Sequence, residues 1–140
     1  MFKQELRSLY KSKRNSLTSN EVEALSLSIA NNVLGLEIWD YDNYHIFFPI
    51  EKNNEIDTKL IIQAIQGKDK NVILPKLNLA KKSLLNFLLT DSTLLKQNEL
   101  GIVEPQSGIL IDDSQIEVVF VPLLSFDKKS KIWVLELFKI

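Results

Sequence analysis

Two cationic side chains stand four residues apart at the start of the chain. Lys3 and Arg7 would share one face of a helix, where both charges can converge on a polyphosphate. A solvated face is the alternative, because charged helix faces usually point into water. Residues 1–14 hold five Lys and Arg side chains against Glu5 alone, in a chain whose net charge is −1. We therefore expect any anion site near this end of the chain.

The carboxylates of interest follow a short apolar segment at residues 44–50. Glu51 and Glu55 flank the loop after it, and in open α/β sheets ligands bind beyond the carboxyl ends of strands. One of the two is therefore expected to contact a ligand, and the alternative is that both are surface carboxylates. Asp112 and Asp113 are neighbours that would point apart, which favours a turn over a catalytic dyad.

The composition leaves little room for histidine or cysteine chemistry. The chain has no cysteine, and His45 is its one histidine, inside an apolar segment. We expect a structural core histidine, because a metal site or a catalytic triad would depend on His45 alone. The four glycines match no phosphate-binding loop pattern. Trp39 and Trp133 are expected to pack in the core rather than to stack on a ligand.

Hydrophobic spacing predicts two helices at the start of the chain. The first covers residues 2–14 and combines an apolar stripe with a cationic face. The second covers residues 19–34, where Thr18 and Glu21 match a capping box. The stripe of the first helix consists of Phe2, Leu6, Leu9 and Tyr10.

The middle of the chain predicts a strand, a helix and a second strand. The apolar segment 44–50 contains Pro49 near its end and the segment 72–75 ends in Pro75, so both are expected to be strands. The helix between them begins at Asp57 or Thr58 and ends at Gly67. This unit is typical of a β-α-β crossover, so the fold class is α/β with a parallel sheet. We also expect strands at residues 84–90 and 116–121, the latter in the core, and an extended loop at 98–109.

Length and composition favour one globular domain over residues 1–140. Hydrophobic residues make up 45% of the chain and charged residues 25%, which is typical of a packed soluble protein. The net charge of −1 gives no general attraction to nucleic acid or to anionic membranes. No apolar run approaches the roughly 20 residues that span a bilayer. We expect a cytoplasmic monomer that binds neither nucleic acid nor membrane.

Five motifs, in order and with suitable gaps, resemble the 5-formyltetrahydrofolate cyclo-ligase family, also called methenyltetrahydrofolate synthetase. The resemblance runs from residue 1 to about residue 129. The motifs are Lys-x-x-Leu-Arg at 3–7, Phe-Phe-Pro-Ile-Glu-Lys-Asn-Asn-Glu-Ile-Asp-Thr at 47–58, Ile-Leu-Pro-Lys at 73–76, Gly-Ile-Val-Glu-Pro at 101–105, and Val-Val-Phe-Val-Pro-Leu-Leu-Ser-Phe-Asp at 118–127.

The resemblance implies an enzyme that uses ATP and magnesium to close 5-formyltetrahydrofolate to 5,10-methenyltetrahydrofolate, with release of ADP and phosphate. It implies that Ile50 and Glu55 contact the substrate, and that Glu51 is a surface residue. It also implies a layered α/β/α domain with a largely parallel central sheet. The ATP-binding segment would consist of Lys3, Gln4, Glu5, Leu6 and Arg7.

The resemblance ends where the family continues into a glycine-rich loop that wraps the ATP phosphates. Residues 130–140 contain no glycine and no Tyr-Asp pair. We therefore expect a C-terminally truncated domain, as a shifted reading frame or a shortened gene would produce. Its tail, residues 130–140, is expected to cover the edge of the strand at 116–121 as a short strand or helix. Three interpretations stay open: a working cyclo-ligase, a non-catalytic remnant that binds folate or nucleotide, and an α/β enzyme unrelated to folate.

Overall fold

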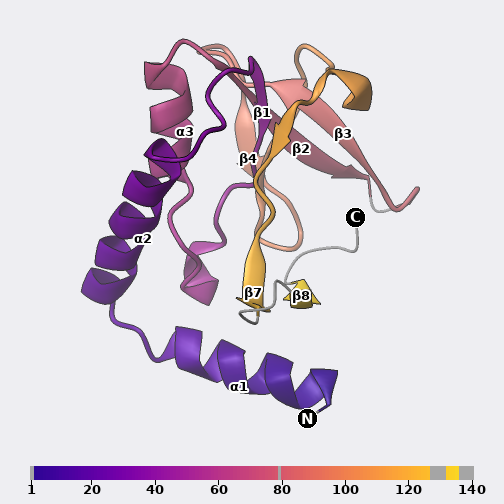
Figure 1. The fold of residues 1–140 in the computed structure, drawn as a ribbon. Helices are drawn as coiled ribbons and strands as arrows, with labels where there is room; N and C mark the ends of the chain where they lie inside the picture. Colours follow the sequence, from indigo (N-terminus) through magenta and orange to yellow (C-terminus); the bar gives the residue numbers. More distant parts are fainter. Residues whose placement is uncertain (1, 79, 127–131, 136–140) are drawn as a thin grey trace.

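The computed structural model describes residues 2–78, 80–126 and 132–135, so most of the predicted tail at 130–140 lies outside the described residues. Two helices open the chain, α1 (Lys3–Asn15) and α2 (Ser19–Leu34), as predicted (Figure 1). The capping box at the start of α2 is confirmed. The Thr18 hydroxyl accepts from the Glu21 N–H at 3.1 Å, and the Glu21 carboxylate accepts from the Thr18 N–H at 3.1 Å.

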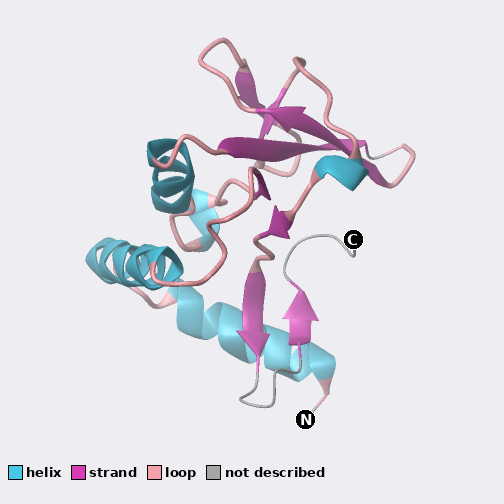
Figure 2. Cartoon of the chain, turned by 45° about the horizontal axis from the view of Figure 1, so that its top comes forward, coloured by secondary structure: helices cyan, strands magenta, loops and turns pink. Residues whose placement is uncertain are grey.

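The predicted β-α-β crossover forms the centre of the fold. Strand β1 (Asn43–His45) leads through helix α3 (Lys59–Gly67) to strand β2 (Asn71–Asn78), and the two strands pair in parallel. Strand β6 (Val118–Val119) pairs in parallel with the other side of β1, and strand β3 (Ser83–Leu88) pairs antiparallel with β2. The sheet order is therefore β3-β2-β1-β6, which confirms an α/β fold with a mostly parallel sheet (Figure 2).

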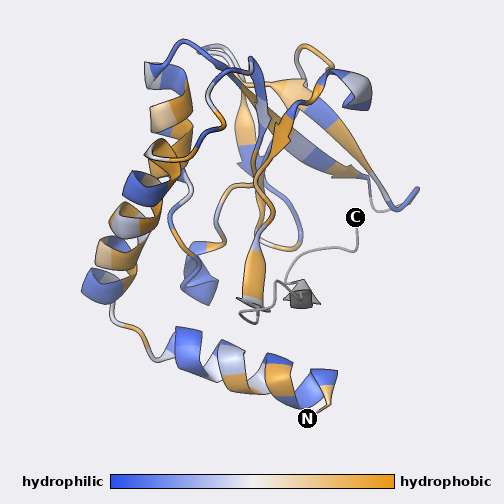
Figure 3. Cartoon of the chain, in the orientation of Figure 1, coloured by the Kyte–Doolittle hydropathy of each residue, from blue (hydrophilic) through white to orange (hydrophobic). Residues whose placement is uncertain are grey.

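The main core lies between this sheet and the helices α2 and α3. Alternate residues along a strand point to the same face of a sheet. The core therefore contains Tyr44 and Ile46 from β1 and the residue after it, and Val72 and Leu74 from β2. Both helices turn apolar sides toward that face (Figure 3). The helical members of the core are Ala30 and Val33 of α2 and Ile61, Ile62 and Ile65 of α3.

Strand β1 is shorter than the predicted strand at 44–50. The Ile46 N–H still donates to the Ile73 carbonyl at 3.1 Å, after which the chain leaves the sheet. The loop that follows contains the short 3-10 helix η1 (Glu51–Asn53). At the start of α3 the Asp57 carboxylate accepts from the Lys59 N–H at 3.0 Å, so Asp57 is the residue that caps this helix.

The segment 98–109 is not a plain extended loop, as the sequence predicted. Strand β4 (Leu95–Gln97) and strand β5 (Val103–Pro105) form an antiparallel pair around it. A buried carboxylate ties this pair to the sheet, since Glu104 accepts from the Leu77 N–H at 3.0 Å. Residues 74–78 of β2 extend beyond the end of β1. The β4–β5 pair therefore contacts a part of β2 that does not pair with β1.

The predicted core strand at 116–121 is shorter and more exposed than expected, although Val118 and Phe120 do pack against the main core. Only Val118 and Val119 form β6, and the preceding residues include the short helix η2 (Asp113–Gln115). Val119 is 49% exposed and Val121 is 47% exposed, because β6 has only β1 beside it among the described residues. An edge strand of a sheet leaves alternate side chains in water when no layer covers that face.

The chain then forms a separate antiparallel pair, strand β7 (Leu123–Phe126) with strand β8 (Ile132–Leu135), close to α1. The tail therefore does form a strand, but it pairs with β7 and not with the edge of β6. In the part of the chain that the structure describes, no helix is both long and apolar enough to cross a lipid bilayer.

The packing of α3 can be tested at Ile65, which is fully buried in the main core. Ile65→Ala removes apolar contacts and leaves a cavity, so we expect the free energy of unfolding to fall by about 2–5 kcal/mol. The matched control is Gln66→Ala, an exposed neighbour on the same helix, which should change stability by less than about 0.5 kcal/mol. Urea titration measures both. A loss below about 1 kcal/mol at Ile65 would show that the core is not packed as described.

Candidate functional site

A cavity of about 520 Å³ lies beyond the carboxyl end of β1. Helices α1 and α2, the loop after β1 and residues 120–124 supply its wall. This volume is in the range of small-molecule sites, which are mostly apolar with a few placed polar groups. The polar members of the wall are Tyr10, Lys13, Arg14, Asn54, Glu55 and Thr58.

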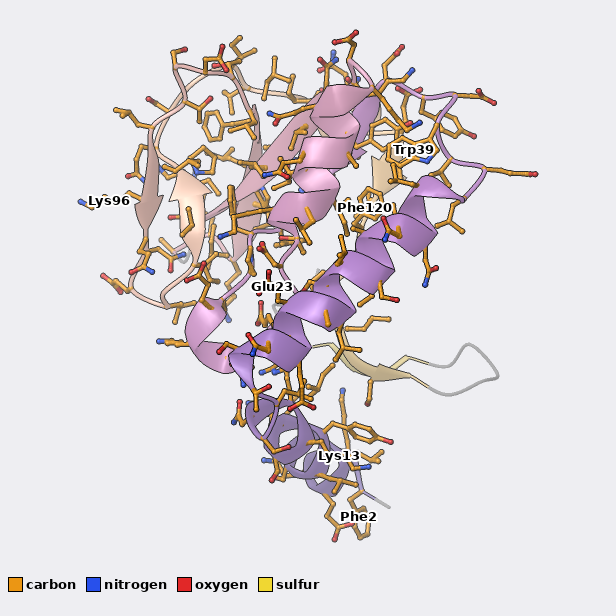
Figure 4. All side chains as sticks on the ribbon, turned by 90° about the vertical axis from the view of Figure 1, so that its left-hand side faces the viewer. Phe2, Lys13, Glu23, Trp39, Lys96 and Phe120 are labelled. Carbon is orange, nitrogen blue, oxygen red and sulfur yellow. The ribbon has the colours of Figure 1, made fainter. Side chains whose placement is uncertain are left out.

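The C-terminal half of α1 provides two cations to this wall. Tyr10, Lys13, Arg14 and Leu17 follow helical spacing and line one side of the cavity. From the sequence we predicted an apolar stripe that includes Phe2 and Tyr10, with the basic residues on a cationic face. Instead α1 buries none of its residues, Phe2 is 80% exposed at the outer end of the helix, and Lys13 lies nearer the body of the protein (Figure 4).

The loop after β1 brings together the two residues predicted to contact substrate. The Glu55 carboxylate accepts from the backbone N–H of Ile50 at 2.8 Å. Ile50 is 5% exposed and does not line the cavity, whereas Glu55 does. Ile50 therefore acts through its backbone, by holding the carboxylate of Glu55 in the cavity wall.

Asn54 fixes this loop to the end of α1. Its backbone is left-handed, with φ 54° and ψ 34°, a conformation that asparagine adopts more readily than most residues. Its side-chain amide donates to the backbone carbonyls of Arg14 at 3.2 Å, Asn15 at 3.4 Å and Leu17 at 3.0 Å. The last carbonyls of a helix lack partners inside it, and Asn54 bonds to two of them, at Arg14 and Asn15, and to the carbonyl of Leu17 just beyond the helix.

Aromatic side chains and a rigid backbone form the rest of the wall. Phe47, Phe48 and Phe120 line the cavity, and the face of an aromatic ring can stack on a flat ligand. The Thr58 hydroxyl donates to the Phe47 carbonyl at 2.7 Å, which holds this backbone against the start of α3. A flat heterocycle rich in N–H groups fits this chemistry, because a carboxylate accepts its hydrogen bonds while rings pack on its faces.

The predicted ATP-binding segment does not share this cavity. Lys3, Gln4 and Glu5 are exposed and Leu6 and Arg7 are half-buried, and none of the five lines the wall. They occupy the other half of α1, with Arg7 about 10 Å from Arg14 along the helix axis. The two predicted binding regions are thus joined by one helix, and the predicted nucleotide segment lies outside this cavity wall.

Three other candidates have structural roles. Glu51 is exposed and pairs with Lys59 at 3.0 Å, which raises the pKa of Lys59. Asp112 accepts from the Ser114 N–H at 3.1 Å and thereby caps η2, as the turn prediction requires. Trp39 packs on the Tyr44 ring at a centroid distance of 5.3 Å. Trp133 lies where side chains are not described.

The sequence analysis missed Arg14 and Asn54. The spacing of Tyr10, Lys13, Arg14 and Leu17 was a signal for one helical face, but nothing local shows that this face meets a cavity. Asn54 carried no signal beyond its place in a polar loop, because its hydrogen bonds reach residues about 40 positions earlier.

Comparison with known proteins identifies the family. The model of the 5-formyltetrahydrofolate cyclo-ligase family matches residues 1–131. This chain belongs to that family. A 5-formyltetrahydrofolate cyclo-ligase from Haemophilus influenzae is 32% identical over 131 residues, which are 91% of this chain and 69% of that protein. A probable 5-formyltetrahydrofolate cyclo-ligase from Schizosaccharomyces pombe is 25% identical over 130 residues, covering 91% and 64%.

Solved structures agree with the cyclo-ligase assignment. The 5,10-methenyltetrahydrofolate synthetase of Aquifex aeolicus superposes with a TM-score of 0.77 at 26% identity, over 91% of this chain and 63% of that one. The enzyme of the same name from Mycoplasma pneumoniae gives 0.67 at 18% identity, over 91% and 68%, and supports the fold alone. The chain thus spans between 63% and 69% of the length of these cyclo-ligase relatives.

His45 lies inside the cyclo-ligase fold and outside the cavity wall, as expected for a structural histidine. It is 4% exposed, and its Nε2 lies 3.0 Å from the Asn86 side-chain oxygen. The Asn86 amide donates in turn to the Asp113 carboxylate at 2.6 Å. Burial lowers the pKa of His45, and the bond to Asn86 and the charge of Asp113 oppose that shift.

We predict that this histidine makes the cyclo-ligase domain less stable in mild acid. Because the folded pKa lies below the ordinary value of 6.5, the unfolded chain binds more protons below that pH. Stability from His45 is therefore full above about pH 6.5 and is lost as the pH falls, with a slope of at most about 1.4 kcal/mol per unit.

Urea titrations between about pH 7.5 and about pH 5.5 measure this slope in the natural chain and in His45→Gln. The variant should lack most of it, because glutamine can still bond to Asn86 but does not titrate. Equal slopes in the two proteins would show that His45 is not the group responsible.

Proposed function

We propose that this chain performs the reaction of its family, the ATP-dependent closure of 5-formyltetrahydrofolate to 5,10-methenyltetrahydrofolate. The observation that carries the proposal is the family match over residues 1–131, together with Glu55 in the wall of a ligand-sized cavity. Curated relatives that cover the same residues are named for this reaction.

The cavity would bind the ring system of the substrate. The Glu55 carboxylate, held by the Ile50 N–H, would accept hydrogen bonds from ring N–H groups. Phe47 and Phe120 would pack on the ring faces and exclude water from them. Arg14, which also lines the cavity, would bind the anionic part of the substrate.

The nucleotide would bind to the outer half of α1. Lys3 and Arg7 are four residues apart on this helix, so both can neutralise a polyphosphate as the resemblance implies. ATP supplies the phosphoryl group that activates the formyl oxygen for attack by the neighbouring ring nitrogen, after which phosphate leaves. Among the described residues no group of three acidic or histidine side chains could hold a metal ion, so we assign magnesium to no residue of this chain.

A second candidate is a non-catalytic protein that binds folate or nucleotide. The residues after the family motifs favour it, since residues 130–140 contain no glycine where the family resemblance implies the start of a glycine-rich phosphate loop. Without backbone N–H groups from such a loop, Lys3 and Arg7 would carry the neutralisation of the phosphates alone.

One assay separates the two candidates. The chain is incubated with 5-formyltetrahydrofolate and MgATP, and the methenyl absorbance is followed beside a control without protein. We expect the absorbance to rise only when both the protein and ATP are present. The double variant Lys3→Gln with Arg7→Gln should lower the affinity for ATP at least about tenfold. Lys81→Gln with Lys96→Gln, two exposed residues outside α1, makes the same charge change and should leave the affinity intact. A rate equal to the control without protein would reject catalysis by this chain.

The substrate site can be tested by calorimetry at Glu55. Glu55→Gln keeps the size of the side chain but removes its charge, so affinity for 5-formyltetrahydrofolate should fall at least about tenfold. The matched control is Glu51→Gln, because Glu51 is exposed and paired with Lys59 outside the cavity wall. Equal affinities in the two variants would contradict a binding role for Glu55.

A further inference from the structure

The contact between Asn54 and the end of α1 joins the two proposed binding regions. Asn54 precedes Glu55 in the loop after β1, and its amide donates to three carbonyls at residues 14–17. The same stretch of α1 carries Lys13 and Arg14 into the cavity wall. The other half of the helix carries Lys3 and Arg7.

Little else in the described residues fixes α1 by burial. The helix has no buried residue, and Leu9 of its predicted apolar stripe is 39% exposed. It lies beside β7 and β8, and the loop around Asn54 meets its C-terminal end (Figure 1). A helix moves largely as one body, so a contact at its end sets the position of both halves.

We propose that Asn54 is a positioning residue that couples nucleotide binding on α1 to substrate binding in the cavity. The inference rests on the function proposed above. A substrate that contacts Glu55 orders the loop, the loop holds α1 through Asn54, and the nucleotide then meets a helix that is already placed. Coupling of this kind is reciprocal, so the nucleotide raises affinity for the substrate by the same factor.

The variants separate the amide of Asn54 from its backbone conformation. Asn54→Gly keeps the left-handed backbone without strain and removes the amide. Asn54→Asp keeps the shape but places carboxylate oxygens against backbone carbonyls, which repel them. Asn53→Ala is the matched control, since Asn53 is the neighbouring asparagine, lies outside the cavity wall and makes no side-chain hydrogen bond within the described residues.

Calorimetry measures the affinity of each protein for a non-hydrolysable ATP analogue with magnesium. Each titration is done once without 5-formyltetrahydrofolate and once with it at a saturating concentration. The natural chain and Asn53→Ala should bind the analogue at least about fivefold more tightly when the substrate is present. In Asn54→Gly and Asn54→Asp that factor should fall close to one, while the affinity for the analogue alone changes little. A variant with merely lower stability would lose affinity for both ligands and keep the ratio.

A second measurement is independent of any ligand. If Asn54 fixes α1, trypsin should cleave after Lys11, Lys13 and Arg14 faster in Asn54→Gly than in Asn53→Ala, under conditions where both are folded.

The outcomes distinguish this inference from the function on which it rests. The inference is overturned, and the function left standing, if the natural chain binds both ligands and Asn54→Gly shows the same ratio of affinities with and without substrate. It is overturned in the same way if the natural chain binds both ligands without any coupling. If the natural chain binds neither the ATP analogue nor 5-formyltetrahydrofolate, both the inference and the proposed function are overturned. Unchanged cleavage of α1 overturns the positioning role of Asn54 directly.

Discussion

The site depends on the loop between β1 and α3, because the hydrogen bonds of this loop hold three helices at the carboxyl end of β1. Asn54 holds the end of α1, and the Asp57 N–H donates to the buried hydroxyl of Ser26 in α2 at 2.8 Å. Thr58 binds the Phe47 carbonyl at the base of α3. Without these contacts, the helices that line the cavity would have no fixed position relative to the loop.

The sequence allowed the helices and the crossover to be predicted because their signals are local. The capping pair Thr18 and Glu21 and the spacing of apolar residues set the limits of α2. Short apolar segments with proline indicated strands, although β2 continues past Pro75 to Asn78. A strand, a helix and a strand of this length favour a parallel crossover, which the structure has. The main core followed from the same patterns, with Ile61 and Ile65 on the buried side of α3.

The remaining features depend on contacts between distant residues and left no local pattern. Residues 116–121 are as apolar as a core strand, yet β6 lies at an edge where Val119 and Val121 meet water. The attachment of the β4–β5 pair to β2 uses Glu104, a buried carboxylate that no hydrophobic pattern reveals. Position in the loop singled out Glu51 and Glu55, the family resemblance chose Glu55 between them, and neither signal included the role of Asn54.

We expect 5-formyltetrahydrofolate to bind in the cavity at the carboxyl end of β1. Amide hydrogen exchange with and without this ligand tests it most directly, since it reports where the chain becomes ordered on binding. If the ligand binds there, exchange should slow in the loop at 46–58, at the end of α1 in residues 10–17, and in residues 120–124. Binding that is detected by calorimetry without slower exchange in these segments would contradict it.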